Sequence, residues 1–254
     1  MKICRYEYNS TINFGLVKND LIFPIESLQD LETRSEPVKI SSVNFLPPVI
    51  PSKIVCVGRN YSEHAKELGN EVPKEPLLFL KAPSAIVLDD EPILLPSQSQ
   101  QIEHEGELGV VIGRDCKNLG ENDDPLDYVL GYLCLNDVTA RDLQRRDVQF
   151  TRAKSFDTFC PISRFIETDL DVSDIRVTTR VNGVVKQDAR TSQMVFPVPF
   201  LIRYISNQMT LNAGDMIATG TPAGVSQLSN GDVCEVEIEG IGILRNPVKN
   251  TENL

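Results

Sequence analysis

Residues 104–113, HEGELGVVIG, combine two acidic residues with an apolar run. The valines, the isoleucine and the closing glycine are typical of a buried β-strand. Side chains two residues apart on a strand point to the same face, so the carboxylates of Glu105 and Glu107 are expected to lie together. Asp137 directly follows a second apolar run, YVLGYLCLN at 128–136, and is expected at the end of another buried strand.

This group of acids predicts a metal site. Two carboxylates held close together repel each other unless a cation lies between them. Three hard oxygen ligands without a histidine or cysteine cluster favour Mg²⁺ or Mn²⁺ over zinc. A simpler interpretation is that Glu105 and Glu107 line a solvated strand face. Glu103 also forms a spaced pair with Glu105, so spacing alone leaves the register of the acids open.

Strand patterns dominate the rest of the chain after residue 53. Further runs rich in Val, Ile and Leu lie at 53–58, 76–81, 175–183, 215–220 and 232–240. The clearest helical patterns are fewer, at 62–68, 139–149 and 199–209. Many strands with few helices predict an α+β, β-rich fold rather than a regular alternation of strand and helix. There is no GxGxxG or P-loop motif, so no nucleotide cofactor is expected.

The chain is expected to divide into a small strand-rich domain at 1–48 and a larger domain at 49–254. The first segment alternates short apolar runs with turns. The stretch 44–53, NFLPPVIPSK, holds three prolines, which exclude a helix and stiffen the connection. The boundary is therefore placed within this stretch.

Composition and charge limit the possible partners and the cellular location. The formal net charge of −11 disfavours nucleic acid, because phosphate binding needs a basic surface. The N-terminus lacks a secretory pattern, and the longest apolar runs are too short to span a bilayer. The six cysteines include no CxxC pair and are interpreted as reduced, buried thiols. We expect a cytoplasmic protein that binds neither nucleic acid nor membrane.

Eight separated blocks between about residue 54 and residue 248 resemble the fumarylacetoacetate hydrolase family, in its acylpyruvase and 2-hydroxyhepta-2,4-diene-1,7-dioate isomerase-like branch. The blocks are IVCVGRNYSEHAKE, EPLLFLK, HEGELGVVIG, NDVTARDLQ, AKSFDTFCP, VNGVVKQDARTSQMVF, LNAGDMIATGTPAGV and EVEIEGIGILRNPV. The resemblance implies a mixed β-sheet rolled into a barrel-like body, with the active site at its mouth, and a homodimer. It also implies a divalent metal, Mg²⁺ or Mn²⁺, held by Glu105, Glu107 and Asp137, which selects Glu105 over Glu103.

The activity that the resemblance implies is metal-dependent hydrolysis of a C–C bond in a small 2-oxo acid, such as an acylpyruvate or fumarylacetoacetate, through a metal-stabilised enolate. The alternative is an isomerase or decarboxylase that acts on 2-hydroxyhepta-2,4-diene-1,7-dioate or oxaloacetate. A further alternative is a catalytically silent homologue that binds a 2-oxo acid.

The resemblance also implies roles for residues around the acids. His64 and Glu67 are three residues apart, on one face of a predicted helix, and would form a catalytic dyad that activates water. Lys154 would supply positive charge for catalysis. His104 precedes the acidic strand and would point away from Glu105, so it is interpreted as structural.

Three residues are expected to bind the substrate: Arg141, Gln144 and Thr221. Arg141 lies four residues after Asp137 and would sit close to the metal. For Thr221 a role in the turn is an alternative, because GTPAG is turn-forming sequence.

Overall fold

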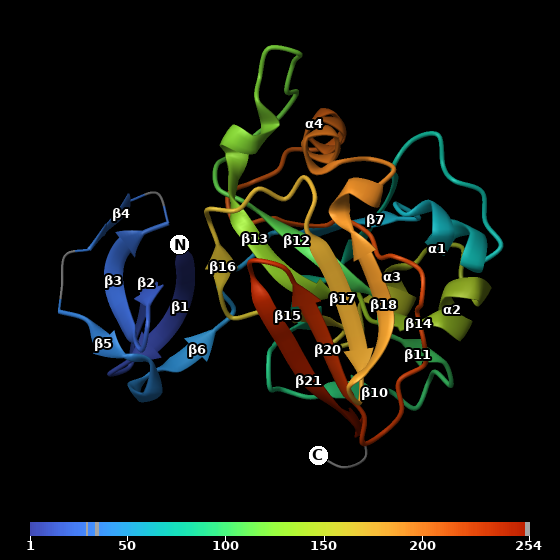
Figure 1. Cartoon of the computed structure of the whole chain (residues 1–254), viewed down its shortest axis with the longest axis horizontal. Helices are drawn as coiled ribbons and strands as arrows, with labels where there is room; N and C mark the ends of the chain where they lie inside the picture. The colour runs from blue at the N-terminus through green and yellow to red at the C-terminus, as the bar shows by residue number, and fades with distance from the viewer. Residues whose placement is uncertain (29, 34–35, 252–254) are drawn as a thin grey trace.

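The computed structural model describes residues 1–28, 30–33 and 36–251, and strands make up most of the regular structure (Figure 1). The first part of the chain forms the group of blue strands in Figure 1. These strands are β1 (Lys2–Tyr8), β2 (Thr11–Lys18), β3 (Leu21–Ser27), β4 (Asp30–Thr33), β5 (Val38–Lys39) and β6 (Asn44–Leu46). β1 pairs with β16 (Ile166–Glu167), so these strands continue the main sheet. The division into domains at residue 48 stays a prediction.

The main sheet places the acidic stretch at its centre. Its further strands include β7 (Ile54–Gly58), β8 (Leu77–Lys81), β12 (Gly106–Ile112), β13 (Val129–Asn136) and β19 (Met216–Ala218). β12 is antiparallel to both β13 and β19, and β19 runs parallel to β7. Every residue of β12 is buried, as its nearly continuous apolar sequence predicts for a strand covered on both faces.

A second sheet of five strands packs on the main one. It contains β10 (Ile93–Leu95), β17 (Arg176–Val181), β18 (Val184–Arg190), β20 (Val233–Ile238) and β21 (Gly242–Asn250). Val177 and Val236 of this sheet share a core with Leu108 and Val110 of β12. The remaining short strands are β9 (Ile86–Leu88), β11 (Ile102–Glu103), β14 (Thr139–Ala140) and β15 (Cys160–Ile162). The mixed sheets confirm the predicted α+β, β-rich class.

The α-helices of the described chain are short: α1 (Ser62–Glu67), α2 (Arg141–Arg146), α3 (Thr151–Lys154) and α4 (Val198–Gln208). Single 3₁₀ turns are η1 (Ile40–Ser42), η2 (Pro83–Ala85), η3 (Pro125–Tyr128) and η4 (Thr191–Gln193). None of the described helices combines the length and the apolar character required to cross a membrane.

Two predicted elements differ from the structure. The single helix expected at 139–149 is wrong, because Thr139–Ala140 pairs with Ile102–Glu103 as a strand and Asp147, which is extended, ends α2. The strand expected through 104–113 begins only at Gly106. His104 and Glu105 do not join the backbone hydrogen bonds between β12 and β13. The N–H of His104 donates to Ser226 O instead, and the N–H of Glu105 donates to the side chain of Asn136.

Candidate active site

Three carboxylates meet where β12 begins and β13 ends. Glu105, Glu107 and Asp137 are buried, and one oxygen from each lies within 4.8 Å of the others. The backbone N–H of Asp137 donates to the carbonyl of Glu105 at 2.8 Å, which fixes the two strand ends side by side. Oxygens bound to one Mg²⁺, Mn²⁺ or Ca²⁺ ion are about 3 to 5 Å apart, since each lies roughly 2.0–2.6 Å from the metal. The donor set and its spacing therefore fit one divalent cation.

Glycines at two positions allow this convergence. A Cβ on Gly106 would lie 2.0 Å from Thr179 Oγ1, so only glycine lets the strand with the two acids approach β17 this closely. Gly220 has a φ of +101°, a conformation that favours glycine, and its N–H donates to Glu107 Oε2 at 2.7 Å. The turn that follows β19 thus holds the carboxylate of Glu107 in place.

Three buried cations surround the acids. Lys154 Nζ donates to Glu105 Oε2 at 2.7 Å and to Asp137 Oδ2 at 2.6 Å. Lys81, at the end of β8, forms an ion pair with the other oxygen of Asp137. Arg141 forms an ion pair with Glu105. Lys154, which was expected to supply positive charge, contacts two of the acids, whereas no role was expected for Lys81.

Glu103 lies outside the group of three carboxylates and has another partner. Its Oε2 accepts from Arg141 Nε at 2.7 Å, and its Oε1 accepts from Gln101 at 2.7 Å. The side chain of Arg141 therefore lies between Glu103 and Glu105, and its Nη1 also donates to Gln144 at 2.5 Å. The two acids thus hold Arg141 in place, and Arg141 in turn holds Gln144.

The surroundings push the pKa values of the two neighbouring glutamates apart. Burial favours the neutral form of Glu105, but the charges of Lys154 and Arg141 outweigh it and hold the pKa of Glu105 below its ordinary value. Burial and the charges of Asp137 and Glu105 raise the pKa of Glu107 well above its ordinary value. Glu107 thus needs either a proton or a further cation, as expected for a metal ligand.

Helix α1 brings His64 and Glu67 to the same place. His64 Nδ1 and Glu67 Oε2 are 3.3 Å apart, and His64 is buried. Glu67 also accepts a hydrogen bond from the backbone N–H of Gly224, at 3.1 Å from Oε1, so its carboxylate is held from two sides. His64 lies close enough to Glu105 for its positive charge, when protonated, to lower the pKa of that glutamate.

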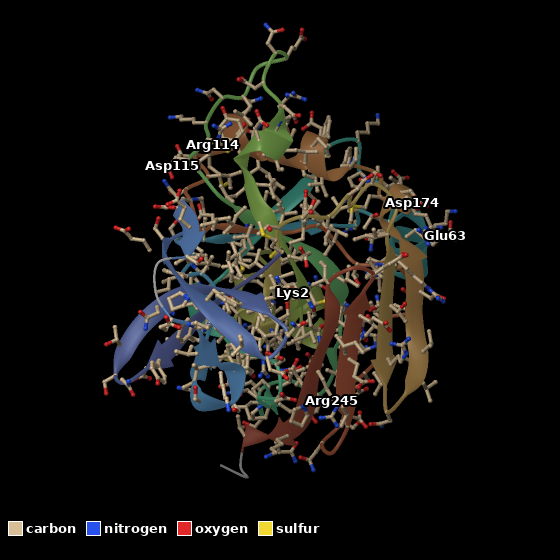
Figure 2. All side chains as sticks on the ribbon, turned by 60° about the vertical axis from the view of Figure 1, so that its left-hand side comes forward. Lys2, Glu63, Arg114, Asp115, Asp174 and Arg245 are labelled. Atoms are coloured by element: carbon tan, nitrogen blue, oxygen red, sulfur yellow. The ribbon has the colours of Figure 1, made fainter. Side chains whose placement is uncertain are left out.

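Most of these groups line one cavity of about 390 Å³. They include every residue for which a site role was expected: His64, Glu67, Glu105, Glu107, Asp137, Arg141, Gln144, Lys154 and Thr221. Figure 2 shows charged side chains such as Glu63 and Arg114 at the periphery of the molecule. The charged groups of the cavity floor are by contrast buried, so their interactions are weakly screened by water.

A buried glutamine, Gln187, supports the cavity wall, although no role was expected for it from the sequence. Gln187 Nε2 donates to Thr221 Oγ1 and to Pro222 O, both at 2.7 Å, and its Oε1 accepts from the N–H of Gly106 at 3.0 Å. The hydroxyl of Thr221 in turn donates to Gly106 O at 2.9 Å. His104 lies 3.2 Å from Gln187 Oε1 and 2.9 Å from Ser226 Oγ, consistent with its structural interpretation.

Comparison with known proteins identifies the family of the chain. Residues 53–249 match the model described as fumarylacetoacetate (FAA) hydrolase C-terminal, and residues 1–48 match the one described as Rv2993c-like, N-terminal. The chain belongs to the fumarylacetoacetate hydrolase family. All eight blocks that carried the resemblance lie within the first matched range, so the expected family is confirmed.

Relatives of this fumarylacetoacetate hydrolase family chain are named as enzymes of several reactions. Oxaloacetate decarboxylase, mitochondrial, from Dictyostelium discoideum is 46% identical over 196 residues, 74% of this chain and 89% of that protein. The structure of 5-carboxymethyl-2-hydroxymuconate delta-isomerase from Mycobacterium smegmatis has 40% identity and a TM-score of 0.89, covering 99% of both chains. Maleylpyruvate hydrolase from Sphingobium sp. SYK-6, in complex with manganese (II) ion and pyruvate, has 28% identity and a TM-score of 0.80, covering 98% of this chain and 99% of that one.

Proposed function

We propose that the protein is a divalent-metal-dependent hydrolase that cleaves a C–C bond in a small 2-oxo acid of the acylpyruvate or fumarylacetoacetate type. The observation that carries this proposal is the meeting of Glu105, Glu107 and Asp137 within 4.8 Å in a cavity also lined by His64 and Glu67. The carboxylates provide a site for a cation, and the dyad provides a base beside it. A cation held by the three acids would act as a Lewis acid towards the 2-oxo-carboxylate group.

The protein's own groups account for the proton transfers of hydrolysis. Glu67 orients His64 through Nδ1, which leaves Nε2 to take a proton from water while the water oxygen attacks the acyl carbonyl carbon. The C–C bond next to that carbon then breaks, and its electron pair stays on the pyruvate fragment, which takes up a proton. Lys154 and Arg141, which line the same cavity, would stabilise the negative charge that develops on this fragment.

Decarboxylation or tautomerisation of oxaloacetate is the second candidate. The 46% identical Dictyostelium relative named oxaloacetate decarboxylase supports it. Loss of the C4 carboxylate of oxaloacetate as CO₂ leaves its electron pair on C3 and so generates the same negative charge on the pyruvate fragment, but it needs no attacking water. An isomerase of the 2-hydroxyhepta-2,4-diene-1,7-dioate type would use the same site. A catalytically silent homologue would use the site to bind a 2-oxo acid without reacting with it.

Mg²⁺ is the cation we propose, with Mn²⁺ as the alternative, because both accept oxygen ligands. The manganese and pyruvate complex of the Sphingobium relative supports a divalent cation and a small 2-oxo acid. A homodimer and a cytoplasmic location are also proposed.

The test is turnover by the purified chain on matched substrates. With Mg²⁺, an acylpyruvate should lose its ultraviolet absorbance and yield pyruvate and the free acid in equal amounts, and EDTA should stop the reaction. Release of CO₂ from oxaloacetate without acylpyruvate cleavage would select the decarboxylase instead. Absence of turnover on acylpyruvates, oxaloacetate and muconate-type diacids would leave only the silent homologue.

A further inference from the structure

Arg59 is held in an unusual backbone conformation at the cavity. It directly follows β7, and its φ is +59°, in the left-handed region that residues other than glycine rarely adopt. The next residue, Asn60, is fully buried and imposes this conformation through its side chain. Its amide donates to Phe196 O at 3.0 Å and to Thr219 O at 2.7 Å, and it accepts from Phe196 N at 2.8 Å. The backbone therefore places the half-buried side chain of Arg59 in the cavity lining.

The guanidinium of Arg59 has no partner within the part of the chain that the structure describes. No hydrogen bond, ion pair or ring contact of its side chain is found there, in contrast to the paired Lys81, Lys154 and Arg141. Arg145, an exposed residue that lines the same cavity, donates to the neutral side chain of Gln101 at 3.0 Å and has no other side-chain partner among the described residues. The outer part of the cavity thus carries two arginines that have no carboxylate against them.

These arginines are not needed to balance the charge of the buried acids. Four buried acids, the group of three and Glu103, lie against three buried cations, Lys81, Lys154 and Arg141, which leaves one negative charge. A divalent cation and the carboxylate of one 2-oxo acid would bring this sum to zero. In the part of the cavity nearer to solvent, the negative charge of Glu67 offsets the positive charge of only one of the two arginines, Arg59 and Arg145. One positive charge therefore remains after the 2-oxo-carboxylate group of the proposed substrate has been counted.

Apolar side chains also line the cavity. They come from Val57, Leu77, Phe79 and Phe150, and the rings of Phe79 and Phe150 pack edge to face at 5.5 Å. Such a wall suits a short hydrocarbon segment of a ligand, which would lie between the buried acids at one end of the cavity and the arginines at the other.

We infer that Arg59 is a specificity-determining residue that binds a second, terminal carboxylate of the substrate. The substrate would carry its 2-oxo-carboxylate at the acids, a short apolar spacer along Phe79, and a second carboxylate at Arg59. This inference rests on the proposed function for the orientation of the 2-oxo-carboxylate end, but it concerns binding and not the bond that is broken.

The test compares two ligands that differ only at the far end and contain no bond for the enzyme to cleave. 2-Oxoadipate ends in a carboxylate, and 2-oxohexanoate has a methyl group in its place. Calorimetry with Mg²⁺ on the full chain should give about 10- to 100-fold tighter binding of 2-oxoadipate, as expected for a charge-assisted hydrogen bond. In Arg59→Asn this ratio should fall to about 2 or less, because asparagine tolerates the left-handed backbone but carries no charge.

Control variants separate the possible outcomes. Arg59→Lys should keep part of the ratio, and Arg146→Gln, which changes an exposed arginine outside the cavity, should keep all of it. A ratio near one in the wild type, an unchanged ratio in Arg59→Asn, or a ratio lost only in Arg145→Gln would overturn the inference. Failure of both ligands to bind would overturn it together with the proposed 2-oxo acid site. A normal ratio in a protein without turnover would refute the proposed hydrolysis alone.

Discussion

Replacing Lys81 by methionine tests whether the buried charges form one balanced group. The side chains of Lys81 and Asp137 are 0% and 1% exposed, so both charges are out of water. After the substitution the carboxylate of Asp137 keeps, among the described residues, only the hydrogen bond from Lys154. Removing one partner of a buried ion pair typically costs about 3–5 kcal/mol of the free energy of unfolding. We expect Lys81→Met to lose about 3 kcal/mol or more.

Lys53 provides a matched control, because it forms an ion pair with Asp215 away from the cavity. Its side chain is 19% exposed, and Asp215 keeps hydrogen bonds from Ser52 N, Ser52 Oγ, Lys53 N and Asn212 N when the ammonium group is removed. Lys53→Met should therefore lose only about 1 kcal/mol. Urea unfolding without added metal measures both values. Equal losses in the two variants, or a loss of less than 1 kcal/mol for Lys81→Met, would show that Lys81 is not required to balance the buried charge of Asp137.

Further substitutions test the dyad, the supporting glutamine and the buried histidine. His64→Ala should lower kcat for an acylpyruvate about 100-fold or more while Mg²⁺ affinity measured by calorimetry stays unchanged, and unchanged kinetics would rule out the dyad. Gln187→Leu leaves the N–H of Gly106 and other buried polar groups without a partner and should cost about 2–4 kcal/mol in urea unfolding; a loss below 1 kcal/mol would contradict its supporting role. Burial lowers the pKa of His104 from 6.5 to about 4, so between these values only the unfolded chain binds the proton and stability falls as the pH drops. The wild type should lose about 3 kcal/mol over this window through His104, and urea titrations of His104→Gln at the same pH values should lack that part of the loss.

The strands could be predicted from local patterns, whereas the choice of Glu105, Glu107 and Asp137 as the group of acids also needed the family resemblance. The side-chain period of a strand puts Glu105 and Glu107 on one face, and a buried strand ending just before Asp137 brings the third carboxylate to the same edge. The two glutamates lie together even though Glu105 precedes β12, since its carbonyl accepts from Asp137 N–H and holds it in line.

The balance of charge could not be predicted, because it depends on contacts distant in sequence. Lys81 ends the apolar run PLLFLK, where a lysine usually reaches solvent, and only the packing of β8 beside β7 directs it to Asp137. Glu103 appeared as a rival ligand, but pairing of β11 with β14 brings it to Arg141 instead. The helix expected at 139–149 failed for the same reason, because this pairing recruits its first two residues.

If Glu105, Glu107 and Asp137 bind one divalent cation, calorimetric titration with Mg²⁺ should detect the loss of any one of these carboxylates. Glu107→Gln keeps the size of the side chain but removes the charge that has no cation partner among the described residues, and Glu103→Gln is the control for removal of a nearby buried carboxylate outside the group. We expect Glu107→Gln to weaken Mg²⁺ binding about 100-fold or more, whereas the Mg²⁺ affinity of Glu103→Gln should stay within about 5-fold of the wild type. Wild-type Mg²⁺ affinity in Glu107→Gln would contradict binding of the cation by these three carboxylates.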